Sequence, residues 1–391
     1  MKAIPRILDS LVSRSAKHYA AIVLTGARRA GKTTLFRNLL PHAEYVLLED
    51  PDIRARATSD PRAFLEDLRR PAILDEIQNV PLLFDYIRTV IDSAPRRMGQ
   101  FFFTGSQEAP LMEGVTESMA GRAAILQMMP FSLAETPKVN LFNGGFPEVL
   151  ADPAGRFVWF SSYLQTYLER DVRAITNVKD LSTFRRFLSL LASRHGQQLN
   201  KSDLATPLGV SIPTIGEWMR ILEITGQILL VAPYFENFGK RLVKTPKVYI
   251  ADSGMACHLL GIQSRAELDR SPFLGDIFEG FVASEIAKSQ VNRGGRRELY
   301  YFRDQQGLEV DFLFASRKGG LCLVECKAAK TVFPQMAGPM LKLRKALKTP
   351  PEKMFVIHRK ASAGRPTDAL TPGVSALPVE DFSVWLNAKT S

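Results

Sequence analysis

The feature that most constrains this chain is a glycine-rich turn that joins an apolar run to a helical one. Residues 21–34 read AIVLTGARRAGKTT and fit the pattern G-x-x-x-x-G-K-[ST]. Glycines at both ends let the backbone wrap closely around a phosphate, and the N–H groups that open the following helix point at it. Within the loop, the Lys32 ammonium is expected to reach the β and γ phosphates of a nucleotide. The predicted phosphate-binding loop consists of Gly26, Ala27, Arg28, Arg29, Ala30, Gly31, Lys32, Thr33 and Thr34.

A second motif supplies the acids that such a loop requires. Residues 71–78 read PAILDEIQ, which indicates a buried strand ending in adjacent carboxylates. Ligands bind at the carboxyl ends of strands in open α/β sheets. Asp75 is expected to hold Mg²⁺ through water, with the Thr33 hydroxyl as a further ligand, and Glu76 to orient and polarise the attacking water. The two motifs together predict ATP and Mg as cofactors and ATP hydrolysis as the reaction.

Strand-like and helical runs alternate over the first third of the chain. Strands are expected at residues 44–50, 72–75, 101–104 and 123–129. This alternation predicts an α/β fold, with a parallel sheet that carries helices on both faces. The third of these strands ends in a polar tip, where Thr104, Ser106 and Gln107 are candidates to sense the γ-phosphate. Ser106 is the candidate assigned a catalytic role, although a plain Gly-Ser turn would read the same way.

Composition narrows the class of protein and its compartment. The chain has 391 residues, of which 46% are hydrophobic, and a formal net charge of +11. This positive balance predicts an acidic partner such as DNA or another nucleic acid, although it would serve solubility equally well. Three cysteines without C-x-x-C spacing predict neither a disulfide framework nor a zinc ribbon. No apolar run reaches the length of a membrane span, so a cytoplasmic protein without a membrane partner is expected.

These features resemble the AAA superfamily of ATPases, and more narrowly the bacterial and archaeal branch with a C-terminal domain of unknown function. The matching pieces are GARRAGKTTL, ILDEIQ, FFFTGSQ, Gly121-Arg122, GGFPEVL at residues 144–150 and YLERDV at residues 167–172. The resemblance implies association between identical subunits, with Arg122 as an arginine finger that acts on the neighbouring subunit's nucleotide. An arginine that satisfies the end of a helix is the alternative.

Residues 199–231 predict a different module. A helical run that opens at residues 202–205, a turn at Gly209 and a second helical run over residues 214–222 follow a helix-turn-helix layout. The strand-like residues 227–231 and the basic residues 240–244 suit a winged variant. Such a module reads DNA bases through Thr214, Glu217 or Arg220, or it only docks another protein, and the sequence leaves both possibilities open.

The last part of the chain holds a second group of acids. Asp311 is expected in one strand, over residues 307–314, and Glu325 and Lys327 in the next, over residues 321–327. An acid followed by E-x-K resembles the core of restriction-endonuclease-like folds. The resemblance implies a metal ion bound by Asp311 and Glu325, with Lys327 beside the scissile phosphate and Glu279 or Glu285 completing the shell. A Glu–Lys pair at a strand end, without catalysis, is the alternative.

The sequence therefore predicts three domains: an AAA-type ATPase at residues 1–150, a helical and winged-helix-like domain at 151–250, and a restriction-endonuclease-like α/β domain at 251–391. The leading function is Mg-dependent ATP hydrolysis coupled to a C-terminal region associated with nucleic acid. Two alternatives stand beside it: a nucleotide-gated regulatory or DNA-binding protein that hydrolyses slowly, and a metal-dependent nuclease.

Overall fold

Two compact units make up the chain in the computed structural model, which describes residues 4–105, 118–168, 181–234, 245–360 and 370–388. Unit 1 comprises residues 1–131 with two short later segments, 224–226 and 291–295, and unit 2 comprises the rest. The three predicted domains stay a prediction. Within the described residues, no helix combines the length and apolar character needed to cross a bilayer.

Unit 1 is built on a five-stranded sheet in which neighbouring strands run parallel, in the order β2-β3-β4-β1-β5. The predicted α/β fold with a parallel sheet is thereby confirmed. Its strands are β1 (Ala21–Thr25), β2 (Glu44–Leu47), β3 (Ala72–Asp75), β4 (Phe101–Thr104) and β5 (Ala123–Gln127). Its helices include α1 (Asp9–Ser15), α2 (Lys32–Leu39), α3 (Pro51–Ser59), α4 (Pro61–Asp67) and α5 (Leu83–Ser93), with a 3-10 turn η1 (Ile77–Asn79).

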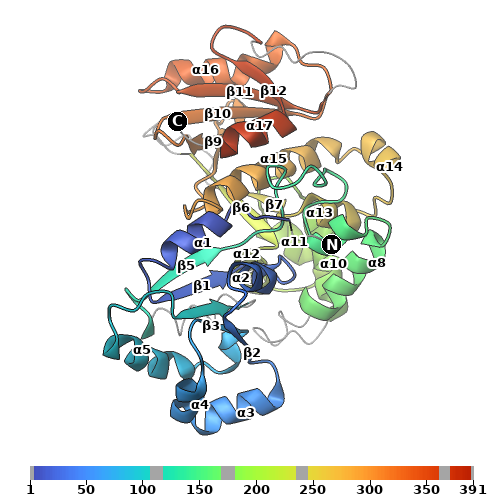
Figure 1. Cartoon of the computed structure of the whole chain (residues 1–391). Coiled ribbons are helices and arrows are strands. Elements are labelled where there is room, and N and C mark those ends of the chain that lie inside the picture. Colours follow the sequence, from blue (N-terminus) through green and yellow to red (C-terminus); the bar gives the residue numbers. More distant parts are fainter. Residues whose placement is uncertain (1–3, 106–117, 169–180, 235–244, 361–369, 389–391) are drawn as a thin grey trace. The chain divides into compact units, whose positions relative to one another are not determined.

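Alternation along the strands of unit 1 sends side chains into two apolar layers. Leu74 and Phe103 pack in one layer with residues of α4 and α5. Ile73 and Phe102 pack in the other with residues of α1 and α2. Figure 1 shows these helices on the two sides of the sheet. Because the strands are covered on both faces, they read as nearly continuous apolar runs, and the polar residues gather where the strands end.

Unit 2 contains a seven-stranded mixed sheet with the order β12-β11-β10-β9-β8-β6-β7. Its strands are β6 (Ile228–Pro233), β7 (Lys247–Ile250), β8 (Tyr300–Arg303), β9 (Glu309–Ala315), β10 (Leu321–Lys327), β11 (Lys353–His358) and β12 (Ser375–Pro378). Several helical elements lie in this unit, and two of them, α12 and α15, end just beyond it. They include α7 (Pro147–Ala151), α8 (Arg156–Tyr163), the π-helical turn η2 (Leu164–Leu168), α10 (Leu181–Ala192), α11 (Lys201–Leu208), α12 (Ile212–Ile224), α13 (Ser253–Leu259), α14 (Arg265–Arg270), α15 (Leu274–Val291), η3 (Pro334–Ala337), α16 (Gly338–Ala346) and α17 (Val379–Asn387).

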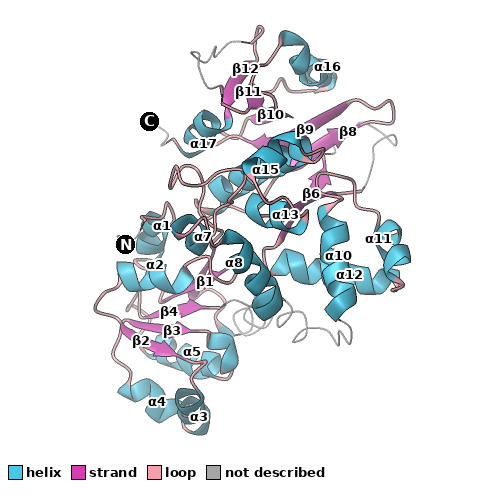
Figure 2. Ribbon diagram, turned by 90° about the vertical axis from the view of Figure 1, so that its right-hand side faces the viewer, coloured by secondary structure: helices cyan, strands magenta, loops and turns pink. Residues whose placement is uncertain are grey.

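Helices also cover the larger sheet, as Figure 2 shows. Leu323 of β10 packs in one apolar cluster with Met340 of α16. Phe355 of β11 lies beside Phe382 of α17, with ring centroids 5.6 Å apart. The neighbouring strands β9 and β10 carry polar residues at one shared end. They are Asp311 of β9 and Glu325 and Lys327 of β10.

The segment with the helix-turn-helix layout joins this sheet. α11 ends at Leu208 and is capped by Gly209, whose φ of 66° lies in the left-handed region, and α12 follows after a short turn. β6 and β7 pair antiparallel, and β6 also pairs in parallel with β8. The hairpin after α12 is therefore continuous with the seven-stranded sheet. A winged-helix role for this segment stays a prediction, and the basic residues 240–244 lie outside the described residues.

The GGFPEVL segment has a structural explanation. Asp252 caps α13 by accepting a hydrogen bond from the Met255 N–H at 3.0 Å, and it accepts a second from the Gly145 N–H at 2.7 Å. A Cβ at Gly144 would overlap the Asp252 carboxylate, at 2.0 Å from Oδ1. The paired glycines let this carboxylate approach the backbone, so the motif fastens two parts of unit 2 together.

Candidate functional site

The loop between β1 and α2 turns at two glycines in the left-handed region. Gly26 has a φ of 125° and Gly31 a φ of 100°. A Cβ at Gly26 would lie 2.1 Å from the carbonyl oxygen of Met128, so a side chain does not fit there. Gly31 directly precedes α2, whose first backbone N–H groups therefore open onto the loop. Together these turns form a backbone cradle at a helix N-terminus, which is a ready-made phosphate site.

Lys32 lies inside this cradle. Its Nζ donates hydrogen bonds to the carbonyl oxygens of Gly26 at 2.9 Å and Ala27 at 3.0 Å. The side chain is buried, with 7% exposed. A buried ammonium in a phosphate-binding loop is placed to make charge-assisted hydrogen bonds with a phosphate that enters the loop. The role of Lys32 at the β and γ phosphates stays a prediction, and Arg29 and Thr34 are exposed.

The Asp75 carboxylate, at the end of β3, accepts hydrogen bonds from several hydroxyl groups. It accepts from the Thr33 hydroxyl at 2.9 Å and from the Tyr45 hydroxyl at 2.7 Å. The Thr104 hydroxyl donates to it as well. Carboxylate and hydroxyl oxygens are the ligands that Mg²⁺ prefers, so Asp75 and Thr33 are suited to hold the ion that accompanies a nucleotide.

Glu76 follows directly and has an unusual backbone conformation for a residue with a side chain, with φ 57°. Its N–H donates to the Thr104 hydroxyl at 3.4 Å, and its carboxylate accepts a hydrogen bond from the Gln78 amide. The side-chain amide of Asn79 donates to the Glu76 carbonyl oxygen at 3.0 Å. These contacts hold a carboxylate next to Asp75, at the edge of the sheet where Lys32 and Thr33 begin α2.

Tyr45 was not singled out from the sequence. It lies on β2, where Leu47 pairs with Asp75 and Tyr45 with Ile73. A diagonal neighbour two residues away lies on the same face of a sheet and within reach of an aromatic side chain. Burial and the hydrogen bond to Asp75 raise the pKa of the Tyr45 hydroxyl above its usual value. The parallel pairing of β2 with β3 was the signal that could have found it, and it requires knowing the strand order.

Removing the Tyr45 hydroxyl is expected to slow turnover without abolishing nucleotide binding. The Tyr45→Phe variant loses a hydrogen bond to the Asp75 carboxylate. Such a bond to a charged acceptor is worth about 1.5–3 kcal/mol, so the rate of turnover can fall by roughly ten- to hundredfold at most. We expect ATP turnover to fall about tenfold, with nucleotide affinity within about twofold of the unmodified chain. Steady-state turnover and nucleotide titration measure the two effects. Tyr19→Phe, at an exposed position in unit 1, is the matched control, and equal turnover in both variants would contradict this role.

The remaining predicted residues of unit 1 stand apart from this cluster. Arg122 makes a two-point ion pair with Asp92 of α5, from Nε to Oδ1 at 2.7 Å and from Nη2 to Oδ2 at 2.9 Å. Its role as an arginine finger stays a prediction. Ser106 and Gln107 lie outside the described residues.

In unit 2, Asp311, Glu325 and Lys327 come together as predicted neighbours on β9 and β10. Asp311 accepts a hydrogen bond from the Cys326 N–H at 2.7 Å. The Lys327 ammonium donates to Oε1 of Glu325 at 2.7 Å. Oε2 of Glu325 is buried and has no hydrogen-bond partner among the residues that the structure describes. A buried carboxylate oxygen without a partner is costly, and it is available to a cation.

The helix α15 contributes one of the two predicted acids. Glu279 accepts from Lys247 at 2.9 Å, and its charge acts on both Asp311 and Glu325. Glu285 instead accepts from the Leu133 N–H at 2.9 Å and pairs with Lys288 at 3.0 Å. Glu279 therefore belongs to this acidic cluster, while Glu285 ties α15 to other parts of unit 2.

Burial and like charges dominate the electrostatics of this acidic cluster. Burial raises the pKa of Asp311 well above its usual value, and the Glu279 and Glu325 carboxylates raise it further. Burial also raises the pKa of Glu325, against the lowering effect of Lys327. Lys247, from β7, was not predicted from the sequence. Burial lowers its pKa, but Glu279 and other nearby carboxylates outweigh this and hold it above the usual value.

A phosphate cradle opposite paired acids, on the edge of a parallel sheet, makes unit 1 similar to a P-loop NTPase fold. The family described as AAA domain matches residues 18–136, which contain both motifs. Two further families match later segments. They are a domain of unknown function (DUF8612) at residues 137–266 and a domain of unknown function (DUF4143) at residues 274–382.

Two relatives from mycobacteria extend the match over nearly the whole chain. They are uncharacterized protein Rv2008c of Mycobacterium tuberculosis and uncharacterized protein Mb2031c of Mycobacterium bovis. Each is 31% identical over 373 residues, which cover 92% of this chain and 83% of the relative. The chain therefore belongs to the same family as these two proteins, with an AAA domain followed by a C-terminal domain of unknown function.

Similarity to solved structures is weaker. The Walker-type ATPase PABY2304 of Pyrococcus abyssi is 15% identical, with a TM-score of 0.40 over 66% of this chain and 96% of its own. The RuvB Holliday junction branch migration motor of Thermotoga maritima is 16% identical, with a TM-score of 0.29 over 57% of this chain and 88% of its own.

Proposed function

We propose that this protein hydrolyses ATP with Mg²⁺ and couples hydrolysis to a region, in unit 2, that associates with nucleic acid. The observation that carries the ATPase part is the convergence of Thr33 and Asp75 beside Lys32 and Glu76. Lys32 supplies positive charge for the β and γ phosphates, and the Thr33 hydroxyl and Asp75 suit the metal ion. Bound Mg²⁺ would neutralise charge on the transferred phosphoryl group.

Glu76 favours hydrolysis over a passive nucleotide gate. Its carboxylate is held by Gln78 at the end of β3, beside Asp75 and on the loop side of the sheet. A carboxylate in this position is suited to orient water for in-line attack. The rival function, a regulator that binds nucleotide and hydrolyses slowly, requires no such residue. The net charge of +11 and the acids and lysines of unit 2 support nucleic acid as the partner.

Measuring ATP turnover by the full chain tests this function. Turnover is expected with Mg²⁺ and to be lost on chelation with EDTA. Single-stranded DNA, duplex DNA and RNA are added separately, and at least one is expected to raise the rate. If Arg122 acts between subunits, specific activity rises with protein concentration. Absence of turnover with any nucleic acid, despite nucleotide binding, would favour the regulator.

A second candidate function, metal-dependent nucleic-acid cleavage, is favoured by Oε2 of Glu325 beside Asp311, which is buried and accepts no hydrogen bond from a described residue. Mg²⁺ is commonly held by one or two carboxylates and several waters, which fits this pair. Among the described residues, no three His, Cys, Asp or Glu side chains are arranged to hold a metal. Asp311 and Glu325 would therefore supply two ligands and water the rest. A metal ion there would polarise the scissile phosphate, and Lys327 would add positive charge.

A further inference from the structure

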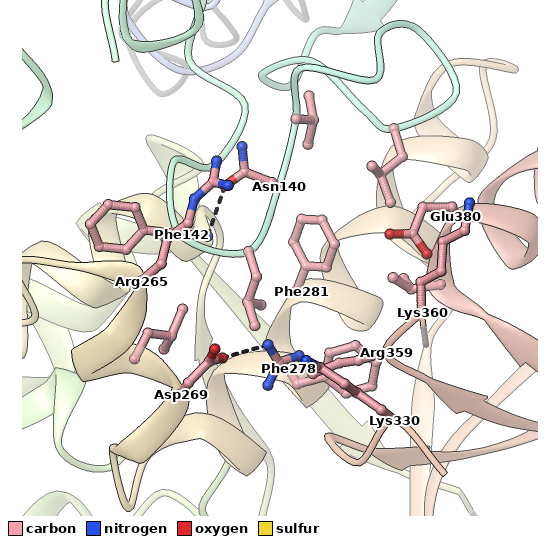
Figure 3. A pocket seen from close by; sticks show the side chains of 15 residues that line it. Asn140, Phe142, Arg265, Asp269, Phe278, Phe281, Lys330, Arg359, Lys360 and Glu380 are labelled. Atoms are coloured by element: carbon pink, nitrogen blue, oxygen red, sulfur yellow. Dashed lines mark hydrogen bonds and ion pairs between the residues drawn. The ribbon is translucent and has the colours of Figure 1, made fainter. Parts of the chain in front are cut away.

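A cavity of about 250 Å³ lies in unit 2, at the edge where β10 and β11 end (Figure 3). The two strands run parallel, with Lys327 opposite His358, so their C-terminal ends meet at one edge of the sheet. Lys330 follows β10 by three residues and Lys360 follows β11 by two, and both line the cavity. This edge also carries Glu325 and Lys327. Ligands of open α/β sheets bind at such edges.

The floor of the cavity is apolar. Phe278 and Phe281 of α15 line it together with Val139, and each of the three is at most 3% exposed. Phe142 lines the wall and is partly exposed. Figure 3 shows Phe142, Phe278 and Phe281 arranged around the same space. A floor of this kind favours an apolar, planar group over a hydrated ion.

The rim of the cavity is positively charged. Arg359 lines it and pairs with Asp269. The other three cations of the rim, Arg265, Lys330 and Lys360, make no ion pair with another described residue, and Glu380 is the remaining acid in the lining. Three exposed cations that pair with no acid of the described residues lie at the mouth of an apolar cavity, which favours a ligand that combines an apolar ring with negative charge.

We propose that this cavity binds one nucleotide of single-stranded nucleic acid, with the base on the apolar floor and the flanking phosphates at Lys330 and Lys360. The inference rests on the proposed association with nucleic acid and names its site. A duplex keeps its bases stacked and paired, so it offers phosphates to the rim but no base to the floor. The volume lies below the usual range for ligand pockets, about 300–1,000 Å³, which suits a single ring system better than a peptide segment.

The position of the cavity also relates it to the acidic cluster of unit 2. Three residues of extended chain span about 11 Å at most, so the Cα atom of Lys330 lies within that distance of the Cα atom of Lys327. A strand held at the cavity is therefore brought to the edge that carries Glu325. The cavity would act as a holding site beside that edge, whether or not the acidic cluster cleaves.

Binding of fluorescent single strands to the full chain tests the proposal. The probe is a 12-residue oligothymidylate, compared with an abasic phosphodiester of equal length and with a duplex. The Lys330→Ala/Lys360→Ala variant is expected to bind the single strand about tenfold more weakly. Its slope of log affinity against log salt should fall by about 1.4, since each single-strand phosphate contact contributes roughly 0.7. The unmodified chain should bind the abasic strand about tenfold more weakly than the oligothymidylate.

The matched control is Lys318→Ala/Lys353→Ala. Both lysines are exposed. Lys318 precedes β10 by three residues and Lys353 begins β11, so the same charge change is made at the opposite edge of the sheet. This control is expected to bind the single strand within about twofold of the unmodified chain. Basal ATP turnover, measured without nucleic acid, should be equal in all three proteins and shows that each is folded.

Several outcomes would overturn the proposal. If both double variants lose affinity for the single strand equally, binding depends only on the overall positive charge of the protein. If neither variant loses affinity, nucleic acid binds at another site, and the proposed association with nucleic acid still holds. If the unmodified chain binds the duplex or the abasic strand as tightly as the oligothymidylate, the cavity does not bind a base. AMP and poly-glutamate are also tested as competitors that displace the probe. If AMP displaces it from the unmodified chain but not from the Lys330→Ala/Lys360→Ala variant, the cavity binds a free mononucleotide. The same result with poly-glutamate would mean that the cavity binds an acidic peptide. If the unmodified chain binds no nucleic acid while hydrolysing ATP, the proposed association itself fails.

Discussion

Replacing Lys32 with alanine is expected to lower ATP turnover at least a hundredfold, with a matching loss of nucleotide affinity. The Lys32 ammonium is buried in the loop and donates to the carbonyl oxygens of Gly26 and Ala27, where it is placed to contact a bound phosphate. Loss of a charge-assisted contact in a water-poor site is worth several kcal/mol, and each 1.36 kcal/mol is tenfold in rate. Lys17→Ala, at an exposed position of unit 1, is the control and should behave as the unmodified chain.

The companion variant Glu76→Gln separates binding from chemistry. It preserves shape but removes the charge that would polarise water, so turnover is expected to fall at least a hundredfold while ATP binding persists. Equilibrium nucleotide binding and steady-state turnover are measured on the same preparations, with Glu66→Gln as the exposed control. Normal turnover by Glu76→Gln would remove Glu76 from the mechanism. Normal turnover by Lys32→Ala would place the nucleotide outside the loop.

Asp311→Asn is expected to abolish any metal-dependent cleavage of nucleic acid by this protein. Asparagine keeps the shape and an acceptor for the Cys326 N–H, so the fold is retained, but it removes one of two carboxylates suited to a divalent cation. Lys327→Ala is expected to lower cleavage strongly, because a positive charge beside the scissile phosphate is lost. The measurement is cutting of single-stranded DNA, duplex DNA and RNA with Mg²⁺ or Mn²⁺.

The control for this cleavage assay is Glu298→Ala, an exposed acid of unit 2. It is expected to cut as the unmodified chain does. Equal cutting by Asp311→Asn, Lys327→Ala and the unmodified chain would point to contamination or to another site. Absence of cutting by the unmodified chain with either metal would leave this part of unit 2 as a binding platform, with the cavity at Lys330 and Lys360 tested separately.

Residues close together in the sequence were predicted well. The loop from Gly26 to Thr33 is covalently continuous, so its composition alone dictates two tight turns and the start of a helix. The strands β3, at Ala72–Asp75, and β10, at Leu321–Lys327, have the predicted bounds, because each is a short apolar run that ends in charge. Such local patterns depend on backbone sterics and side-chain alternation, which a sequence expresses directly.

The sequence by itself thus determined the phosphate loop, the paired acids and the α/β class, while the tertiary structure decided which distant residues meet them. Tyr45 reaches Asp75 because β2 lies beside β3 in register, and neither strand encodes that neighbour. Lys247 enters the acidic cluster from β7, and the cavity rim is assembled from separate turns and helices. Contacts of this kind arise when segments far apart along the chain pack to bury apolar surface, and many sequences of equal local pattern could pack differently.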